Sequence, residues 1–345
     1  MGGDHAPEIV IQGASIAHRR LPTVRFLLFG DEARLAPLLK ADPKLAAVAE
    51  VRHTPLAITA DDKPAQALRK GGQSSMRLAI DAVRDGHAAG MVSAGNTGAL
   101  MAMAKVVLRT QPGIDRPAMI QYFPTMRGES ALLDLGANVE CDAKNLVQFA
   151  IMGAGFARSV LGVEKPTVGL LNVGAEELKG HDTVREAAKI LRETNNLDFV
   201  FHGFVEGDDI GAGTVDVFVT DGFTGNAVLK ATEGTAKLVV TFLRAALKRS
   251  WASKLGYLLA KPALDALRAK LDPRLYNGAM FLGLNGVVVK SHGGTDGEGF
   301  ASAISVAADM VRGDFNERIH ADLELMAPAA VLSGVPATTA PVAGG

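Results

Sequence analysis

Cysteine and aromatic side chains are scarce in this sequence. It contains a single cysteine, Cys141, and aromatic residues make up 5% of its 345 positions. One cysteine excludes an intramolecular disulfide and is typical of proteins from reducing compartments. Closely spaced His, Cys and Asp residues of the kind that bind zinc are also missing. We therefore expect no disulfide, no metal and no cofactor.

Long apolar runs and an excess of charge are missing as well. No uncharged apolar run reaches the roughly 20 residues that span a bilayer, and the first residues lack the basic and apolar parts of a signal peptide. The formal net charge is −1, whereas nucleic-acid-binding domains carry clustered positive charge. The sequence therefore predicts a cytoplasmic protein without a nucleic-acid partner.

Familiar nucleotide-binding and nucleophile motifs do not occur. No G-x-G-x-x-G follows an apolar run and there is no G-x-x-x-x-G-K-[ST], so the usual dinucleotide and P-loop interpretations fail. Ser93, in Met-Val-Ser-Ala-Gly, lacks the first glycine of a nucleophile elbow. Cys141 lies near an expected helix start, where thiolates are favoured, but we interpret it as a loop thiol with no essential role.

Short runs rich in Val, Ile and Leu alternate with helix-like segments. Apolar residues on consecutive positions predict strands buried on both faces, as in parallel sheets. The runs are 24–30, 48–53, 90–95, 118–123, 131–136, 167–174, 198–203, 215–222 and 286–293. We therefore predict an α/β protein with a catalytic core over residues 1–230 and 275–326. Residues 327–345, rich in Pro, Ala, Gly and Thr, are predicted to be a disordered tail.

Loops rich in Gly, Asn and Thr follow four of these strands, at 93–99, 172–181, 221–226 and 291–294. Small residues let backbone amides converge on an anion, and the helix that follows adds partial positive charge. We expect the loops to meet at the carboxyl edge of one sheet, where open α/β sheets bind ligands. Such a pocket, rich in neutral donors with one or two cations and no nucleophile, suits phosphate as a bound reactant.

Each loop supplies candidate side chains. The catalytic candidates are Lys179, a cation in a tight loop, Asn226, a donor to an oxyanion, and His292, which can titrate near neutrality. The candidates for binding phosphate or substrate are Ser93, Gly95, Asn96, Thr97, Asn138, Asn172, Asp221 and Gly225. Structural alternatives stay open: Asn96 or Thr97 caps a helix, Lys179 forms a surface salt bridge, and His292 caps or packs.

Residues 231–274 are predicted to form a basic amphipathic helical hairpin that projects from the core, with a break near Lys261-Pro262. Between Lys237 and Arg274 there are nine Lys or Arg residues against two Asp. Interleaved apolar residues suit contact with an acidic protein or an anionic membrane surface. The predicted contact residues are Arg244, Lys248, Trp251, Lys254 and Leu255. The alternative is a helix packed on a partner subunit.

Six segments in order resemble the PlsX family of phosphate acyltransferases. They are MGGDHAP at 1–7, SAGNTGA at 93–99, DLGAN at 134–138, NVGAEELKG at 172–180, DGFTGN at 221–226 and NGVVVKSHG at 285–293. The resemblance, which covers residues 1–320, implies a homodimeric, Rossmann-like three-layer α/β/α enzyme with a mostly parallel sheet. That fold is similar to isopropylmalate dehydrogenase and phosphate acetyltransferase.

The resemblance also implies a reaction and partners. The family transfers an acyl group from acyl carrier protein to inorganic phosphate, and the acyl phosphate feeds the first acylation of glycerol 3-phosphate in phospholipid synthesis. The implied partners are acyl carrier protein and a membrane glycerol-3-phosphate acyltransferase, reached by peripheral membrane association. Lys179 and Asn226 match positions that we interpret as catalytic.

We expect direct attack of phosphate, held by the 93–97 loop and Lys179, on the thioester carbonyl. Three alternatives stay open. The donor can be a short-chain acyl-coenzyme A. The chain can be a nicotinamide-dependent decarboxylating dehydrogenase on the same fold, although no acidic metal cluster is evident. It can also be a non-catalytic scaffold for carrier protein or membrane.

The sequence departs from the family pattern at two places. Gly-Ala-Met-Phe at 278–281 replaces the usual Gly-Ala-Pro-Leu, which puts the local turn in doubt. The family normally has a strand ahead of the Gly-Gly-Asp-His loop, and a strand-to-helix loop needs such a strand. We therefore expect that the chain as numbered lacks a first strand, with a vacancy beside residues 24–30 or 90–95.

Overall fold

The computed structural model describes residues 1–195, 197–270, 272, 274–313, 315 and 319. The predicted tail, 327–345, lies outside the described residues. The strands are β1 (Phe26–Gly30), β2 (Ala49–His53), β3 (Gly90–Ser93), β4 (Ala118–Pro124), β5 (Glu129–Leu133), β6 (Thr167–Leu171), β7 (Val200–Val205), β8 (Val217–Val219), β9 (Ala279–Leu282) and β10 (Val287–Lys290). Each of the nine predicted runs overlaps one strand, and of the strands in the described residues only β9 was not predicted.

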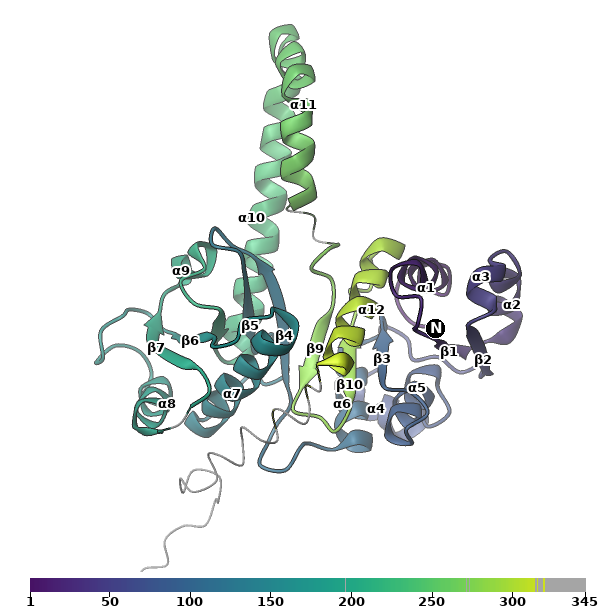
Figure 1. Ribbon diagram of the computed structural model, residues 1–345, viewed down its shortest axis with the longest axis horizontal. Helices are drawn as coiled ribbons and strands as arrows, with labels where there is room; N and C mark the ends of the chain where they lie inside the picture. The colour runs from purple at the N-terminus through teal and green to yellow at the C-terminus, as the bar shows by residue number, and fades with distance from the viewer. Residues whose placement is uncertain (196, 271, 273, 314, 316–318, 320–345) are drawn as a thin grey trace, which may run out of the picture.

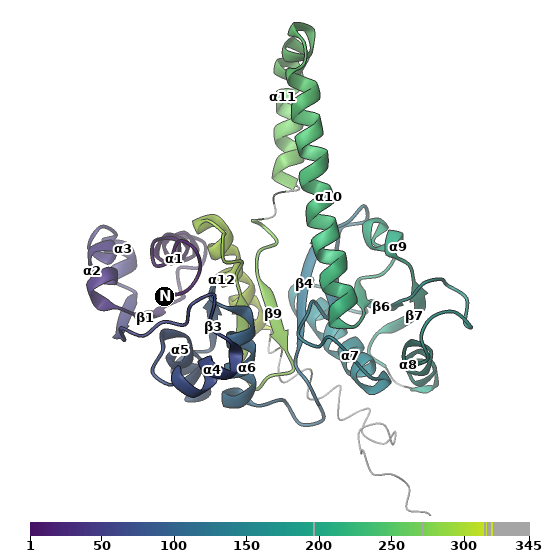
Figure 2. The ribbon, with the colours of Figure 1, turned by 180° about the vertical axis from the view of Figure 1, so that it is seen from behind.

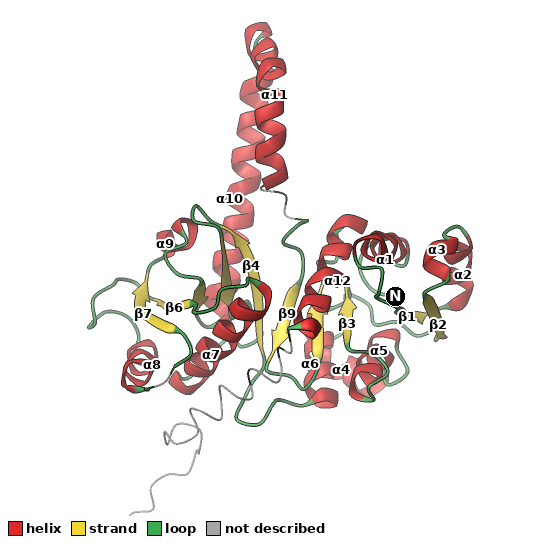
Figure 3. Cartoon of the chain, viewed as in Figure 1, coloured by secondary structure: helices red, strands yellow, loops and turns green. Residues whose placement is uncertain are grey.

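Helices cover the strands on both faces (Figure 1). They are α1 (Glu8–Arg20), α2 (Glu32–Lys40), α3 (Pro43–Ala46), α4 (Pro64–Lys70), α5 (Ser75–Arg84), α6 (Thr97–Leu108), α7 (Ala143–Val160), α8 (Asp182–Glu193), α9 (Gly207–Ala212), α10 (Gly222–Lys248), α11 (Trp251–Lys270) and α12 (Gly297–Arg312). The alternation of strands and helices confirms the predicted α/β/α layers (Figure 3).

The central sheet has eight strands in the order β3-β10-β9-β4-β5-β8-β6-β7. β3 is parallel to β10, and β5, β8, β6 and β7 are parallel to one another. β9 and β4 are antiparallel to both of their neighbours. The sheet is mostly parallel, as predicted, but its two parallel halves run in opposite directions.

The core under the β5-β8-β6 half is built around α7. Asp142 and Asn145 form a capping box that starts this helix. Phe149 and Phe156 are fully buried. Gly153 has no side chain because a Cβ there would come within 2.5 Å of Val217 on β8. The missing side chain lets α7 lie close against the sheet, which seals one face of this half.

The helical hairpin is present and projects from the body (Figures 1 and 2). α10 has 27 residues and α11 has 20, and the buried residues of α10 are confined to its first turn. The predicted break at Lys261-Pro262 is wrong, because α11 continues through Pro262. The chain reverses instead at residues 249–250, between the two helices. Within the described residues, no helix has the length and apolarity required to cross a membrane.

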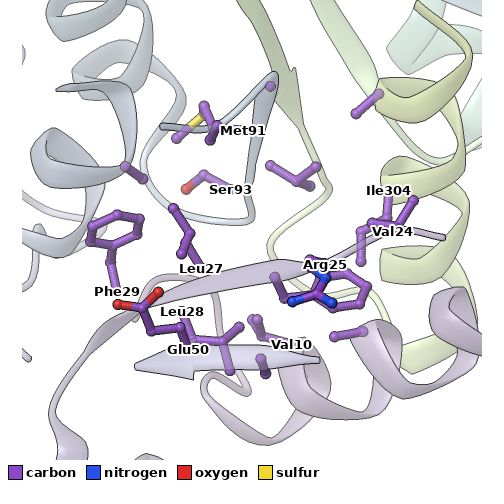
Figure 4. A pocket seen from close by; sticks show the side chains of 18 of the residues that line it. Val10, Val24, Arg25, Leu27, Leu28, Phe29, Glu50, Met91, Ser93 and Ile304 are labelled. Atoms are coloured by element: carbon purple, nitrogen blue, oxygen red, sulfur yellow. The ribbon is translucent and has the colours of Figure 1, made fainter. Parts of the chain in front are cut away.

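The amino-terminal strands β1 and β2 form a separate two-stranded parallel sheet. β1 has no strand partner on its other side, and β3 pairs only with β10 among the described residues. A cavity of about 690 Å³ lies between them, lined by residues of β1 and β3 (Figure 4). The vacancy expected beside residues 24–30 or 90–95 is therefore present, and both strands border it.

Gly278 precedes β9 with a φ of +130°, and Met280 and Phe281 of β9 are buried. Gly-Ala-Met-Phe at 278–281 thus leads directly from a glycine turn into a strand of the central sheet.

Candidate active site

The predicted loops do not all meet at one edge of the sheet, and that expectation is wrong. Because β9 and β4 reverse the strand direction, β3 and β10 end at the opposite edge from β5, β8 and β6. We call the first set the β3 edge (93–97 and 291–294) and the second the α10 edge (134–138, 172–180 and 221–226). Six candidates lie at the α10 edge and five at the β3 edge, and of these Gly225, Asn226 and Thr97 lie in the first turns of helices.

Asp134 organises the first loop of the α10 edge. Its carboxylate is fully buried (0% exposed) and accepts hydrogen bonds from the backbone N–H of Met119, Ala137 and Asn138 at 2.9, 3.1 and 2.6 Å. It also accepts one from Asn138 Nδ2 at 2.9 Å. Burial raises the pKa of Asp134, and these four donors oppose that rise. The carboxylate therefore fixes the conformation of residues 134–138.

Asn138 has a structural role in this arrangement. Its side chain is buried and donates to the carbonyl of Pro117 at 2.8 Å as well as to Asp134. Its own carbonyl accepts from the backbone N–H of Gly222 at 2.7 Å. Asn138 therefore ties the 134–138 loop to the start of α10 and is not free to bind a ligand through its amide nitrogen.

The start of α10 is pressed against that loop. Asp221 is the N-cap: its carboxylate accepts from the backbone N–H and the hydroxyl of Thr224 at 2.9 and 2.8 Å. A Cβ on Gly225 would come within 2.0 Å of the Asp134 carbonyl oxygen, and a Cβ on Gly222 within 2.5 Å of the Asn138 carbonyl oxygen. Any other residue at Gly225 would push the helix away from the sheet.

Asn226 follows directly and is exposed. Its Cβ is 3.6 Å from the position that a Cβ on Gly136 would occupy, so its side chain lies over the 134–138 loop. No hydrogen bond to its amide is recorded among the described residues. Asn226 lies near the amino terminus of α10, where the helix dipole places partial positive charge and favours a bound anion. Its side-chain amide is therefore available to donate a hydrogen bond to such an anion.

Lys179 comes from the neighbouring strand end. β6 pairs with β8, with Leu170 opposite Val219, so the loop after β6 starts beside the start of α10. The Lys179 ammonium is half-exposed (51%) and lies 2.8 Å from the Glu176 carboxylate. This hydrogen bond raises the pKa of Lys179, so the side chain is charged at neutral pH. The surface salt bridge left open as an alternative is present.

Asn172 holds the same loop closed. Its Nδ2 donates to the carbonyls of Gly174 and Lys179, both at 3.1 Å. Gly180 has a φ of +88°, and a Cβ there would overlap the Asn172 amide oxygen at 1.8 Å. The loop therefore needs glycine at 180 both for its backbone conformation and for the space that Asn172 fills.

At the β3 edge, the candidate side chains have structural partners. Asn96 is the N-cap of α6, accepting from Ala99 N at 3.0 Å. Its Nδ2 lies within hydrogen-bond distance of three carbonyls, those of Thr59, Ala60 and Asp62. The capping alternative is thus the observed one for Asn96. Thr97 is exposed at the first helical position.

Ser93 and Gly95 belong to the cavity region and its rim. Ser93 Oγ accepts from Gly95 N at 3.1 Å, and the Ser93 side chain points into the space between β1 and β3 (Figure 4). Gly95 packs against Gly2, where a Cβ would come within 2.8 Å of the Gly95 Cα. Ala94 and Gly95 of this loop thus pack against Gly3 and Gly2 at the amino terminus.

His292 and Lys290 complete the β3 edge. His292 is exposed, and its Nδ1 accepts from Gly294 N at 3.2 Å within the same loop, whereas Asp296 is the N-cap of the following helix, α12. Lys290, which the sequence interpretation missed, is 9% exposed and donates to the carbonyls of Ala94 and Ser291. Burial lowers the pKa of Lys290 to about 8.

Cys141 is half-buried next to the α10 edge, with Sγ 3.7 Å from the Asn138 carbonyl. Burial and the nearby Asp134 carboxylate raise the pKa of this thiol to about 12. A protonated thiol is a poor nucleophile, so the geometry agrees with the interpretation of Cys141 as a loop thiol. Among the described residues, no three His, Cys, Asp or Glu side chains come together as metal ligands.

Sequence reasoning also missed Asp134 and Arg116. Asp134 stands directly after a buried strand, a position at which a carboxylate is a detectable signal. Arg116 is an exposed cation on the chain leading to β4, with Nη1 3.2 Å from the Glu140 carbonyl. Nothing in its local sequence indicates that it lies near the loop that carries Asn138.

Comparison with known proteins places this chain in a family. A family described as "Fatty acid synthesis protein" matches residues 1–318. A phosphate acyltransferase of Rhodospirillum centenum is 64% identical over 323 residues, which cover 94% of this chain and 91% of that protein. A phosphate acyltransferase of Rhodospirillum rubrum is 60% identical over 323 residues, covering 94% of this chain and 92% of that protein.

Two solved structures share the fold at low sequence identity. A phosphotransacetylase from Streptococcus pyogenes superposes with a TM-score of 0.54 at 16% identity, covering 87% of this chain and 98% of that one. A branched-chain phosphotransacylase from Enterococcus faecalis also gives 0.54, at 14% identity, covering 90% and 97%. The α/β/α fold expected from the sequence is therefore confirmed by structure. Given the sequence identities to curated relatives, the chain belongs to the PlsX family of phosphate acyltransferases, enzymes that transfer acyl groups in fatty acid and phospholipid synthesis.

Proposed function

We propose that this acyltransferase takes its acyl group from acyl carrier protein and transfers it to inorganic phosphate, releasing acyl phosphate and free carrier protein. The observation that carries the proposal is the α10 edge. There, an unoccupied amide, Asn226, and a charged lysine, Lys179, come from neighbouring strand ends. The nearby thiol, Cys141, is protonated. This arrangement favours direct transfer between two bound reactants over a covalent acyl-enzyme.

In the proposed reaction, phosphate binds at the Lys179 ammonium and attacks the thioester carbonyl. The carbonyl oxygen gains negative charge in the tetrahedral intermediate, and Asn226 donates a hydrogen bond to it. One such donor is typically worth about 3 kcal/mol of transition-state stabilisation. The pantetheine thiol, with a pKa of roughly 8.5, leaves as the thiolate without a strong acid. The enzyme's main contribution is then to position both reactants.

The phosphate site in this proposal differs from the one expected from sequence. Lys179 and the 93–97 loop end at opposite edges of the sheet, and Asn96 is committed to capping and to loop carbonyls. We therefore assign phosphate to the α10 edge alone. Ser93, Gly95, Asn96 and Thr97 therefore have no role in binding phosphate in this proposal, and His292 has no step in the reaction.

The hairpin is proposed as the surface that meets the donor and the membrane. Arg244, Lys248 and Lys254 are exposed on it, which suits an acidic carrier protein. Trp251, at the distal end, is 80% exposed, and Leu255 is also exposed, which suits insertion into an anionic membrane surface. A homodimer, and peripheral contact that passes acyl phosphate to a membrane glycerol-3-phosphate acyltransferase, belong to the same proposal.

The test is direct detection of the product. Purified protein is incubated with phosphate and with the same acyl group on carrier protein or on coenzyme A, and acyl phosphate is trapped with hydroxylamine as the hydroxamate. We expect hydroxamate from the carrier-protein donor, dependent on phosphate. Higher kcat/KM with a short-chain coenzyme A donor would favour that alternative. Absence of product with either donor would indicate a scaffold.

A further inference from the structure

Large apolar side chains are exposed around the candidate site at the α10 edge. Four of them, from the loops after β5 and β6 and from the first turn of α10, are between 64% and 86% exposed: Val139, Val173, Leu178 and Phe223. We call these four residues the apolar rim. Single exposed apolar residues are ordinary on protein surfaces, whereas apolar residues gathered around polar groups mark sites of ligand or protein contact.

Phe223 lies beside the proposed oxyanion donor. It precedes Asn226 by three positions in α10, and residues with this spacing share one helix face with Cβ atoms about 5–6 Å apart. Of the 14 phenylalanines, all of which lie in the described residues, only Phe223 and Phe242 are exposed. Exposure of an aromatic ring at this position is therefore unusual for this chain.

Val139 adjoins the start of α10 on the side of β5. It directly follows Asn138, whose carbonyl accepts a hydrogen bond from the Gly222 N–H at 2.7 Å. Gly222 in turn directly precedes Phe223. The residues that follow the two ends of this hydrogen bond are thus both apolar and exposed, and their backbones lie close together.

The side of β6 contributes Val173 and Leu178. Leu170 of β6 pairs with Val219 of β8, and neighbouring strands are about 4.8 Å apart, so the chain leaves β6 beside the start of α10. Leu178 directly precedes Lys179, the proposed phosphate cation. The apolar rim therefore lies on both sides of the first turn of α10.

The carboxylates of the 172–180 loop have partners of their own. Glu176 forms a salt bridge with Lys179 at 2.8 Å, and Glu177 forms one with Arg192 at 3.3 Å. Among the large side chains described in this loop, Val173 and Leu178 are the apolar ones that face solvent. The loop thus offers apolar surface next to its cation.

The hairpin of the same chain does not cover the apolar rim. Phe242, the exposed phenylalanine of the hairpin, lies about 28 Å along the helix axis from Phe223, and the distal part of the hairpin projects away from the body (Figures 1 and 2). The apolar residues of the hairpin and the apolar rim are therefore two separate surfaces, and the rim needs an occupant of its own.

The position of the rim identifies that occupant. In the proposed reaction the thioester carbonyl oxygen lies at the Asn226 amide, and the acyl chain is bonded directly to that carbonyl carbon. The first methylenes of the chain must then lie next to Asn226, where Phe223 is the neighbouring side chain on the helix. Removing methylenes and exposed apolar side chains from water together is favourable.

We infer that the apolar rim binds the acyl chain of the donor, and that Phe223 and Leu178 are specificity-determining residues that favour long acyl chains over short ones. The inference rests on the proposed function, since the place of the carbonyl is taken from Asn226. A protein partner is a less suitable occupant, because stable protein interfaces engage roughly 20–30 residues on each side, whereas the rim has four.

The first test is the dependence of kcat/KM on acyl-chain length. Butyryl, octanoyl and dodecanoyl groups are supplied on coenzyme A, below the concentration at which micelles form, and on carrier protein, and acyl phosphate is trapped with hydroxylamine. We expect kcat/KM of the wild type to rise at least about tenfold from butyryl to dodecanoyl, since full burial of one methylene changes an equilibrium about fourfold.

Substitutions in the rim should reduce this preference. Phe223→Ser and Leu178→Ser should each lower kcat/KM at least about fivefold for dodecanoyl donors and less than about twofold for butyryl donors. The effect should be the same on coenzyme A and on carrier protein, because both carry the same chain. Phe223→Leu should restore most of the dodecanoyl rate. Met126→Ser, at an 88% exposed residue in the turn between β4 and β5, is the matched control.

Three outcomes would overturn the inference. Equal losses for butyryl and dodecanoyl donors would mean that Phe223 only shapes the start of α10. Losses confined to carrier-protein donors would assign the rim to the carrier protein itself. A lower mass of Phe223→Ser in sedimentation equilibrium, with an unchanged chain-length profile, would assign the rim to a subunit contact.

The second test measures binding without turnover. S-dodecylpantetheine and S-ethylpantetheine are thioethers that cannot donate an acyl group, and their Kd values are measured by calorimetry. We expect tighter binding of the dodecyl compound in the wild type and loss of that difference in Phe223→Ser. This result without any hydroxamate would contradict the proposed reaction but keep the rim as the acyl site. Hydroxamate without any dependence on chain length would do the reverse.

Discussion

Gly225 illustrates how single residues set the geometry of the α10 edge. Without a side chain it lets the start of α10 approach the Asp134 carbonyl, and it places the next residue, Asn226, over the 134–138 loop. Asp134 holds that loop from below through four hydrogen bonds. The Asn226 side chain therefore lies over a loop whose conformation is fixed by the buried, hydrogen-bonded Asp134 carboxylate.

Replacing Asn226 by Ala removes the proposed oxyanion donor. We expect kcat to fall about 100-fold, since one such donor contributes factors of this size. The melting temperature should stay within about 2 °C, because the side chain is exposed and no hydrogen bond to it is recorded. Lys230→Ala, exposed one turn further along α10, is the control and should leave kcat unchanged. An Asn226→Ala enzyme with wild-type kcat would remove the assignment.

Substitutions at Lys179 and Glu176 are expected to change the KM for phosphate in opposite directions. Lys179→Ala removes the proposed phosphate cation and should raise the KM for phosphate at least about tenfold. Glu176→Ala removes the carboxylate that forms the salt bridge with the Lys179 ammonium, so the KM for phosphate should fall or stay constant. Steady-state kinetics at varied phosphate distinguishes the two. Equal increases in KM would mean that only the shape of the loop matters.

Cys141 is expected to be dispensable. Burial holds its pKa at about 12, so the thiolate needed for nucleophilic attack is rare at neutral pH. Cys141→Ser should keep at least about half of the wild-type kcat/KM, measured with the carrier-protein donor. Mass-spectrometric detection of an acyl group on Cys141 during turnover would contradict direct transfer to phosphate.

At the scale of elements, α10 has two parts with different roles. Its first turn is buried against the sheet and carries the candidate site, and Val228 and Leu229 in the next turn still pack against the core. The distal part of α10 projects away from the body together with α11 (Figure 2). Their exposed apolar residues, among them Phe242, Trp251 and Leu259, are interleaved with basic ones. One helix therefore connects the proposed site with a surface suited to partners.

Charge reversal on the hairpin tests its proposed role with the donor. The triple variant Arg244→Glu, Lys248→Glu and Lys254→Glu should raise the KM for the carrier-protein donor at least about fivefold, because charge complementarity governs such encounters. The KM for the same acyl group on coenzyme A is the control and should change little. Equal changes for both donors would indicate a structural defect.

The apolar end of the hairpin is tested with lipid. Trp251→Asp with Leu255→Asp should reduce sedimentation with vesicles that contain anionic lipid, since apolar burial drives such binding. Leu238→Asp, exposed on α10 and farther from the turn of the hairpin than Trp251 and Leu255, is the control. If neither form changes lipid binding, the hairpin is better explained as a subunit contact.

At the scale of the whole molecule, the reversal of the sheet at β9 and β4 separates two half-sheets. The β3 half carries the amino-terminal loop and Lys290, and the other half carries the candidate site. Lys290 is buried, and its ammonium donates to the carbonyls of Ala94 and Ser291. Burial disfavours the charged form of Lys290 more than the nearby Asp4 favours it, so protonation of Lys290 lowers the stability of the fold.

The pH dependence of unfolding should reveal this cost. Burial lowers the pKa of Lys290 from 10.5 to about 8 in the folded chain. Between these values the unfolded state binds more protons than the folded state, so the free energy of unfolding rises with pH across this interval. Urea unfolding of wild type and Lys290→Met at pH 7.5 to 10 measures the difference. An equal slope in both proteins would show that Lys290 keeps an ordinary pKa.

The sequence by itself determined the class of fold, the position of nine strands and the identity of the family. Consecutive Val, Ile and Leu residues bounded by glycine loops are local patterns, and burial on both faces follows from them. The same local reasoning placed Lys179, Asp221 and Asn226 just after strand ends, although Asn226 lies in the helix that follows.

Only the tertiary structure decided which of those loops face one another. Strand direction depends on pairing between residues distant in sequence, such as Ile120 with Met280 and Leu133 with Ile120, and no local pattern records it. For the same reason the sequence did not reveal that the Asn96 and Asn138 side chains donate hydrogen bonds to carbonyls distant in sequence. Nor did it reveal that Asp134 fixes the loop over which Asn226 lies. Local patterns specify which face of an element is buried, whereas long-range packing specifies what it is buried against.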